Sequence, residues 1–348
     1  MAANLLSRYP WVSRPFIVCA PMKVMTGPAL AVAVSRAGGL GFIGPGAKTQ
    51  DTNEDLKKAS SLLQGASSIK TINSALPVGV GYQLWADDIN VAVATIEKYK
   101  PCAAWLYAPN QGPKQYDDWS SKIRQVSPET QIWIQIGTVK EAKQLLQNHE
   151  QPDVVVVQGS ESGGHGRAND GMGLMALFPE VADVMASSRI PLFAAGGIAD
   201  GRGVSAALCL GAAGAVMGTR FLAASEARIS KGYQDEVVRA VDAATSTTRT
   251  HLYNHLRGTF GWPEEYSPRT IFNQSYVEQQ EGKPFEELKK LHDEAVKEGD
   301  KGWGPGGRLA TYAGASIGLI HDVKSAGDIV HGIREDTLGR LQQLSGND

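Results

Sequence analysis

The chain has 348 residues, of which 42% are hydrophobic, and it carries a formal net charge of -2 with a pI of about 6.4. A chain of this length can bury a large core without disulfides, and its nearly balanced charge excludes the basic field that recruits nucleic acid or anionic membranes. The three cysteines form no C-x-x-C pair and no run of about 18 apolar residues occurs, so a cytoplasmic protein with small-molecule partners is expected.

Short apolar runs alternate with segments of helical length through the first two thirds of the sequence. The runs cover residues 16–20, 41–43, 77–81, 103–107, 131–136, 153–158, 191–195 and 215–218. The main helical patterns between them cover 29–37, 53–63, 88–99, 139–148, 172–186 and 203–210. Strict alternation predicts a parallel sheet, and eight apolar strands favour an α/β fold of the (β/α)₈ TIM-barrel type over an open sheet.

After Phe221 the composition becomes polar, charged and aromatic, with no convincing strand. We expect a barrel over residues 1–222, a helical insertion over 223–304 and C-terminal helices over 305–348 that return to the barrel. Apolar helical patterns at 311–320 and 328–344 support this return. The insertion follows the last strand, so it is expected to cover the barrel mouth and select the substrate. The candidates for lining the mouth are His251, Tyr253, Trp262 and Tyr266.

Two glycine-containing loops follow the seventh and eighth strands, where ligands of a TIM barrel bind. The first contains Gly196 and Gly197, and the second begins Gly218-Thr219-Arg220. Glycines leave backbone N–H groups accessible to phosphate oxygens, and a helix that starts nearby adds a favourable dipole. Together the loops predict a phosphate-binding site; tight helix packing on glycine is the alternative.

The loop after the sixth strand places His165 between Gly164 and Gly166. A histidine at the catalytic rim of a barrel is suited to removing a proton from a bound carbon acid. The alternative is an ordinary surface-loop histidine. In the same loop, Glu161 is interpreted as a solvated charge rather than a second acid.

Two further patterns are discounted. Residues 39–44 match G-x-G-x-x-G, but the match follows a helix and runs through a strand, which is the reverse of a dinucleotide-binding context. His251 and His255 are four residues apart without a third ligand, so they are interpreted as packing residues. No metal site is predicted.

The motifs resemble the nitronate monooxygenase family, formerly called nitropropane dioxygenases, whose members are FMN-binding TIM barrels with a helical substrate domain. The resemblance covers nearly the whole chain and is carried by residues 20–22, 30–41, 158–166, 194–202, 218–221 and 312–320. It implies that His165 is the catalytic histidine and that FMN is the cofactor. The implied flavin-ring residues are Pro21, Met22 and Gln158; the residues toward the ribityl chain and phosphate are Gly163, Gly197, Met217, Gly218 and Thr219, with Gly164 and Gly196 beside them.

The implied activity is oxidation of an alkyl nitronate, and of nitroalkanes as a further substrate class, with O₂ to a carbonyl compound and nitrite. Lys23 or a helix dipole would stabilise charge at the flavin. Two departures from the family leave the substrate and the oxidant open: Gly81 ends a Gly-Val-Gly run where many members have Asn, and Tyr107 begins a Tyr-Ala-Pro-Asn turn. The rivals are an FMN-dependent NAD(P)H:quinone or enoyl-thioester reductase, a non-redox barrel for a phosphorylated substrate, and a non-catalytic flavin-binding module. A homodimer is also left open.

Overall fold

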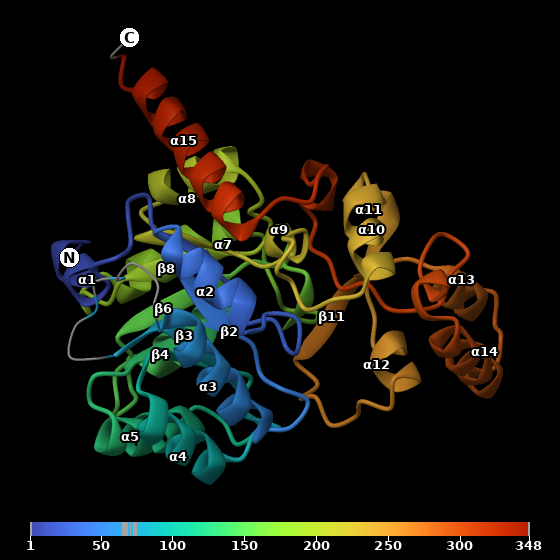
Figure 1. The fold of residues 1–348 in the computed structure, drawn as a ribbon, viewed down its shortest axis with the longest axis horizontal. Helices are drawn as coiled ribbons and strands as arrows, with labels where there is room; N and C mark the ends of the chain where they lie inside the picture. The colour runs from blue at the N-terminus through green and yellow to red at the C-terminus, as the bar shows by residue number, and fades with distance from the viewer. Residues whose placement is uncertain (1, 65–68, 70, 72–74, 347–348) are drawn as a thin grey trace.

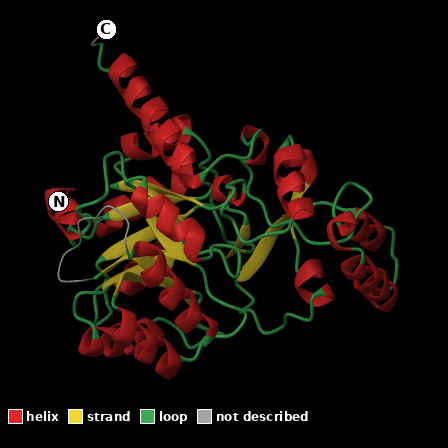
Figure 2. Ribbon diagram, viewed as in Figure 1, coloured by secondary structure: helices red, strands yellow, loops and turns green. Residues whose placement is uncertain are grey.

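A computed structural model describes residues 2–64, 69, 71 and 75–346 of the chain. Eight parallel strands close into a barrel in the order β1-β2-β3-β4-β5-β6-β8-β9, which confirms the predicted TIM barrel. The barrel closes where β1 pairs with β9 in parallel, with Val18 beside Val216. Figure 2 shows these strands in the middle of the molecule with helices around them. The barrel strands are β1 (Ile17–Cys19), β2 (Leu40–Ile43), β3 (Leu76–Gln83), β4 (Pro101–Tyr107), β5 (Gln131–Ile136), β6 (Val154–Gln158), β8 (Leu192–Ala195) and β9 (Gly214–Met217).

The helices of the barrel begin where the sequence supplies capping residues. The Asp88 carboxylate accepts the N–H groups of Asn90 and Val91 at the start of α4, and the Thr138 hydroxyl accepts that of Glu141 in α6. Helix α5 was not predicted, although Tyr116, Trp119 and Ile123 give it an apolar face. The helices are α1 (Ala2–Arg8), α2 (Pro28–Arg36), α3 (Asp51–Leu63), α4 (Ile89–Tyr99), α5 (Lys114–Val126), α6 (Val139–Leu145), α7 (Leu174–Met185), α8 (Gly201–Cys209) and α9 (Thr219–Leu222).

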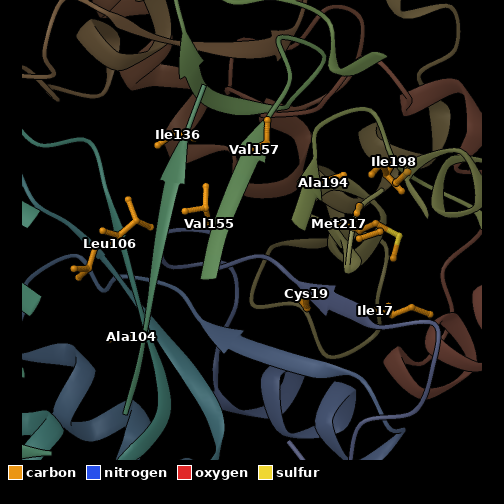
Figure 3. Packing of buried hydrophobic residues seen from close by; sticks show 14 of the residues in the cluster. Ile17, Cys19, Ala104, Leu106, Ile136, Val155, Val157, Ala194, Ile198 and Met217 are labelled. Atoms are coloured by element: carbon orange, nitrogen blue, oxygen red, sulfur yellow. The ribbon is translucent and has the colours of Figure 1, made fainter. Parts of the chain in front are cut away.

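Alternate strand residues pack into two separate layers of core. Figure 3 shows part of the outer layer, where Val155, Val157 and Met217 belong to a cluster shared with the surrounding helices. Their neighbours along each strand point into the barrel, where Trp133 packs against Phe193 with ring centroids 4.7 Å apart. The barrel is therefore filled by side chains, which favours the carboxyl ends of its strands as the place for a ligand.

The insertion contains strands, contrary to the expectation of an entirely helical segment. Strands β10 (Thr247–Arg249) and β11 (Tyr266–Ile271) form an antiparallel sheet with β7 (Gly164–Arg167), in the order β10-β11-β7. Strand β7 reads Gly-His-Gly-Arg and has no apolar alternation, so its pairing with β11 depends on tertiary contact. The remaining elements of the insertion are α10 (Lys231–Arg239), α11 (Ala243–Ser246), α12 (Leu252–Leu256), α13 (Gln274–Gln280), α14 (Phe285–Lys297) and the 3₁₀ helix η1 (Gly299–Gly302). Figure 1 shows α12, α13 and α14 together at one end of the molecule.

The chain after the insertion differs in part from the expected two helices. Residues 311–320 contain only a short 3₁₀ helix, η2 (Ile317–Leu319), because their backbone bonds to other loops instead. The Ala315 N–H donates to the Glu161 carbonyl, and the Gly314 N–H donates to Thr219 Oγ1. The second expected helix is present as α15 (Ala326–Leu344), which packs against α8 and α2 and closes the outside of the barrel (Figure 1). Within the described residues, no helix is long and apolar enough to cross a membrane.

Candidate active site

A cavity of about 610 Å³ lies at the carboxyl ends of the barrel strands. It is lined by all but one of the residues predicted for the site: Pro21, Met22, Gln158, Gly163, Gly164, His165, Gly196, Gly197, Gly218 and Thr219. The exception is Met217, whose side chain is buried in the outer core layer while its neighbour Val216 lines the cavity. Alternation along β9 explains this difference, since consecutive strand residues point to opposite faces.

Packing alone explains several of the glycines in these loops. A Cβ on Gly163 would lie 2.4 Å from the Gly314 nitrogen, and one on Gly196 would lie 2.8 Å from the Gly159 carbonyl oxygen. Gly196 and Gly197 also have φ angles of 96° and 72°, which side chains rarely adopt. Close approach to loop backbone and positive φ angles thus require glycine at these positions, without excluding ligand contacts by their backbone.

The expected helix dipole at the loop after β8 is already engaged by the protein. Asp200 caps α8, and its carboxylate accepts the N–H groups of Arg202 and Gly203. An anion would have to compete with this carboxylate for the start of α8. The loop after β9 is a better candidate for phosphate contact.

Gly218 is the glycine that packing does not explain. Its φ of -100° suits any residue, and a Cβ there would lie 3.5 Å from Met22 Sδ and 3.9 Å from Ala20 Cβ, which are ordinary contact distances. Gly218, Met22 and Ala20 all line the cavity, so a side chain on Gly218 would take up cavity space. Its absence leaves room beside the first turn of α9 for a ligand.

The floor of the cavity presents an unused hydrogen-bond donor. The Gln135 Oε1 atom accepts from Trp105 Nε1 at 3.1 Å, which fixes the amide orientation. The buried Gln135 Nε2 has no partner among the described residues. A buried amide without a partner is costly, so this group fits a ligand with acceptor atoms, as the edge of a flavin ring has.

His165 is held in the cavity by three contacts and is not a freely exposed loop residue. The Tyr107 hydroxyl donates to the His165 carbonyl at 3.1 Å, and the Trp262 ring stacks on the imidazole with centroids 3.6 Å apart and planes 6° apart. Asn254 Nδ2 lies 2.9 Å from His165 Nε2. Burial lowers the pKa of His165 well below its ordinary value, and interactions with the nearby His251, Arg249, Arg257 and Lys23 lower it further. The imidazole is therefore neutral near pH 7.

Arg249, on β10, holds the loop that carries His165. Its guanidinium donates to the carbonyls of Ser160, Ser162 and Gly164 at 3.0, 3.1 and 3.3 Å, and to the Ser267 carbonyl at 2.5 Å. Burial and the nearby Arg269 lower the pKa of Arg249 to about 10. This role could not be predicted from the sequence, because an arginine bound to carbonyls leaves no local sequence signal.

Glu161 belongs to the same loop and is not the solvated charge that the sequence suggested. Its carboxylate oxygens accept the Leu174 N–H at the start of α7, at 2.9 and 3.0 Å. Side chains that accept such N–H groups stabilise helix starts. Glu161 is therefore a structural residue of the loop.

Most of the insertion residues that line the cavity differ from those expected. Of the four candidates only Trp262 lines it; Tyr253 instead donates from its hydroxyl to Asn273 Oδ1 at 2.7 Å, and His251 and Tyr266 lie outside the lining. The residues of the insertion that line the cavity are Asn254, Arg257, Gly258, Thr259, Phe260 and Trp262.

The two departures from the family pattern both lie at the cavity. A Cβ on Gly81 would lie 2.4 Å from Pro21 Cβ, so the barrel loop after β1 occupies the space of a larger residue. Tyr107 packs edge-on against Tyr266, at 5.1 Å between ring centroids. Lys23 also lines the cavity, and its Nζ lies 3.4 Å from Gln83 Oε1.

His251 and His255 stack with ring centroids 5.9 Å apart, and Phe260 stacks on His255 in turn. In the part of the chain that the structure describes, no group of three or more His, Cys, Asp or Glu side chains is arranged to hold a metal ion.

The chain is similar to known proteins over nearly its full length. Residues 11–130 and 120–336 match the nitronate monooxygenase family. The chain is 56% identical over 342 residues to nitronate monooxygenase npaC of Metarhizium robertsii, covering 98% of this chain and 96% of that one. It is 33% identical over 363 residues to a nitronate monooxygenase of Neurospora crassa, covering 98% and 94%.

Solved structures also share its fold. FabK from Thermotoga maritima is 26% identical and has a TM-score of 0.73, with 99% of each chain covered. A nitroalkane oxidase from Streptomyces ansochromogenes is 23% identical, has a TM-score of 0.73 and covers 95% of this chain and 98% of its own, a likeness of fold alone.

Proposed function

Because the chain belongs to the nitronate monooxygenase family, we propose that it oxidises alkyl nitronates with O₂, through non-covalently bound FMN, to a carbonyl compound and nitrite. The observation that carries the proposal is the position of His165. It lies neutral and largely buried in the same cavity as the Gly218 loop. A proton acceptor and a binding site for a planar, phosphorylated cofactor thus share one enclosed space.

The residues of the cavity fit an FMN molecule. Gly218 and Thr219 would contact its phosphate, with the backbone of Gly196 and Gly197 nearby, while Pro21, Met22, Gln158 and the free amide of Gln135 would contact the ring. When bound, FMN would supply the electron transfer from the nitronate to O₂, which amino-acid side chains do not provide.

The side chains have separate tasks toward the substrate. His165 would accept the α-proton of a neutral nitroalkane, a step that a preformed nitronate does not need. The cationic Lys23 and Arg257 would attract the negative charge of the nitronate. Burial lowers the pKa of Lys23, and the nearby Asp87 carboxylate opposes this shift. Trp85, Phe260 and Trp262 would exclude water from the alkyl group.

The insertion would select the substrate under this proposal. It supplies Asn254, Arg257, Phe260 and Trp262 to the cavity lining. Differences in the 254–262 segment would then change which alkyl groups are accepted without changing FMN binding.

The alternative function is reduction of a quinone or an enoyl thioester by NAD(P)H through the same cofactor. The likeness to FabK is a likeness of fold, which is compatible with either function. Barrel folds carry many chemistries, so the family match weighs more than the fold.

The test begins with purified protein and chromatography of the flavin released on denaturation. We expect FMN in a ratio of about one per chain, and O₂ consumption with nitrite formation when ethyl nitronate is added without NAD(P)H. FAD, or a colourless protein after incubation with FMN, would contradict the cofactor assignment. NADPH oxidation that depends on a quinone or an enoyl thioester, without nitrite from nitronate, would support the alternative.

A further inference from the structure

A chain of hydrogen bonds leads from the protein surface to the ring of His165. Arg257 Nη1 lies 3.0 Å from the Tyr312 hydroxyl, and this hydroxyl lies 3.2 Å from Asn254 Oδ1. Asn254 Nδ2 then lies 2.9 Å from His165 Nε2. Nothing in the sequence motifs assigns a role to Asn254.

The direction of each bond follows from the first residue of the chain. A guanidinium has only donors, so the Tyr312 oxygen accepts from Arg257. The hydroxyl proton of Tyr312 is then free to be donated to Asn254 Oδ1. This bond places the amide carbonyl of Asn254 toward Tyr312 and its NH₂ group toward His165.

The NH₂ group of Asn254 can only donate, so His165 Nε2 must accept. A neutral imidazole carries one proton, and it must then lie on Nδ1. We propose that Asn254 is a positioning residue that holds His165 as the neutral Nδ1–H tautomer, with the lone pair on Nε2. This inference deepens the proposed function and rests on it only for its effect on turnover.

The surroundings of Asn254 make this bond strong and well oriented. The Asn254 side chain is 2% exposed, so water does not compete for its amide. Helix α12 carries Asn254 and ends at Leu256, just before Arg257, so the first and third members of the bond chain come from one short segment. Trp262 stacked on one face of the His165 ring limits its rotation, and the Tyr107 hydroxyl bound to the His165 carbonyl holds the backbone.

The same bond controls when His165 can act as a base. An imidazole nitrogen has one lone pair in the ring plane, and Asn254 occupies that of Nε2. A substrate proton reaches Nε2 only after the Asn254 amide has moved away from it. Asn254 therefore fixes which nitrogen is basic and occupies the lone pair of that nitrogen in this structure.

The test uses a change that reverses the polarity of this bond while keeping its shape. Asn254→Asp replaces the NH₂ donor by a carboxylate oxygen, which accepts from His165 instead. Long-range ¹H–¹⁵N NMR of histidine-labelled protein reads the protonation of each ring nitrogen, and His165→Asn assigns the His165 signals. Asn90→Asp, at an exposed site on α4, is the control for an added negative charge.

In the native protein we expect an unprotonated Nε2 and a protonated Nδ1 on His165. In Asn254→Asp we expect Nε2 to be protonated, and in Asn90→Asp no change. A native His165 that is protonated on Nε2, or an unchanged tautomer in Asn254→Asp, would overturn the inference. Tyr312→Phe gives a second test, because losing the hydroxyl should give a mixture of both tautomers; a single unchanged tautomer counts against the proposed chain.

Kinetics separate this inference from the proposed function. Tyr312→Phe, which adds no charge to the cavity, should lower kcat/KM for a neutral nitroalkane more than kcat/KM for the nitronate, since only the first substrate needs the base. Equal losses with both substrates would contradict a role through His165. If the NMR result holds and the native protein turns over neither substrate, the tautomer assignment stands and the proposed function fails.

Discussion

The two halves of the cavity wall are held in place by different forces. The barrel half is set by buried apolar strands and by glycines packed against backbone, as at Gly163 and Gly196. The insertion half acts through directed hydrogen bonds, from Arg249 to the carbonyls of the His165 loop and from Asn254 to the His165 ring. The difference suggests a division of labour, in which burial forms the cofactor site and hydrogen bonds orient the catalytic group. Substitutions in the two halves should therefore have separable effects.

The largest separable effect is expected for His165→Asn. Removal of a positioned base should lower kcat/KM for a neutral nitroalkane by about 10²–10⁴-fold, and that for its nitronate by less than about tenfold. FMN content should not change, because the barrel half is intact. Steady-state kinetics with nitroethane and ethyl nitronate check this. Equal losses would mean that His165 acts by positioning or charge, and no loss would place the base elsewhere.

The next effect concerns the attachment of the His165 loop to the insertion. Arg249→Met keeps the length of the side chain but removes its hydrogen bonds to the carbonyls of Ser160, Ser162, Gly164 and Ser267, of which Ser160 still accepts from Arg269. At about 1 kcal/mol for each of the four lost bonds, we expect a loss of about 4 kcal/mol in the free energy of unfolding, measured by denaturant titration. Arg202→Met, on the exposed start of α8, is the control. An unchanged denaturation midpoint in Arg249→Met would show that the His165 loop is stable without the bonds from Arg249.

A smaller effect on the barrel half should appear at Gly218. Gly218→Leu places a side chain in the cavity beside Met22, and we expect FMN affinity to fall at least about tenfold, equivalent to about 1.4 kcal/mol. The protein should remain folded, since no described atom lies closer than 3.5 Å to the added Cβ. Flavin fluorescence titration measures the affinity. Gly332→Leu, where a Cβ meets open space on α15, is the matched control. Full FMN affinity in Gly218→Leu would place the phosphate elsewhere.

The smallest effect is a shift in pH dependence. Because the pKa of His165 lies well below its ordinary value, the neutral, proton-accepting form persists below pH 6.5. For a neutral nitroalkane, kcat/KM should therefore stay level as the pH falls from 8 through about 6.5, the ordinary imidazole pKa, and decline only at lower pH. A decline centred at or above pH 6.5 would contradict the effect of burial on this histidine.

The sequence predicts the two halves unequally well. The barrel strands follow from apolar runs between turn residues, and even the unpredicted α5 shows its apolar face once Tyr116 and Trp119 are aligned. Strand β7 and the bonds of Arg249 and Asn254 have no such pattern, since each depends on a partner about 80 to 100 residues away in the chain. His165 could be found from its glycine loop, whereas the residues that orient it required the folded structure.

The most direct test of the proposed activity is anaerobic mixing of the FMN-loaded protein with ethyl nitronate and, separately, with NADPH. Loss of the flavin absorbance near 450 nm reports which compound donates electrons to the bound FMN. We expect rapid loss with the nitronate and none with NADPH on the same timescale. Rapid loss with NADPH and none with the nitronate would contradict the proposed function and support a reductase built on this fold.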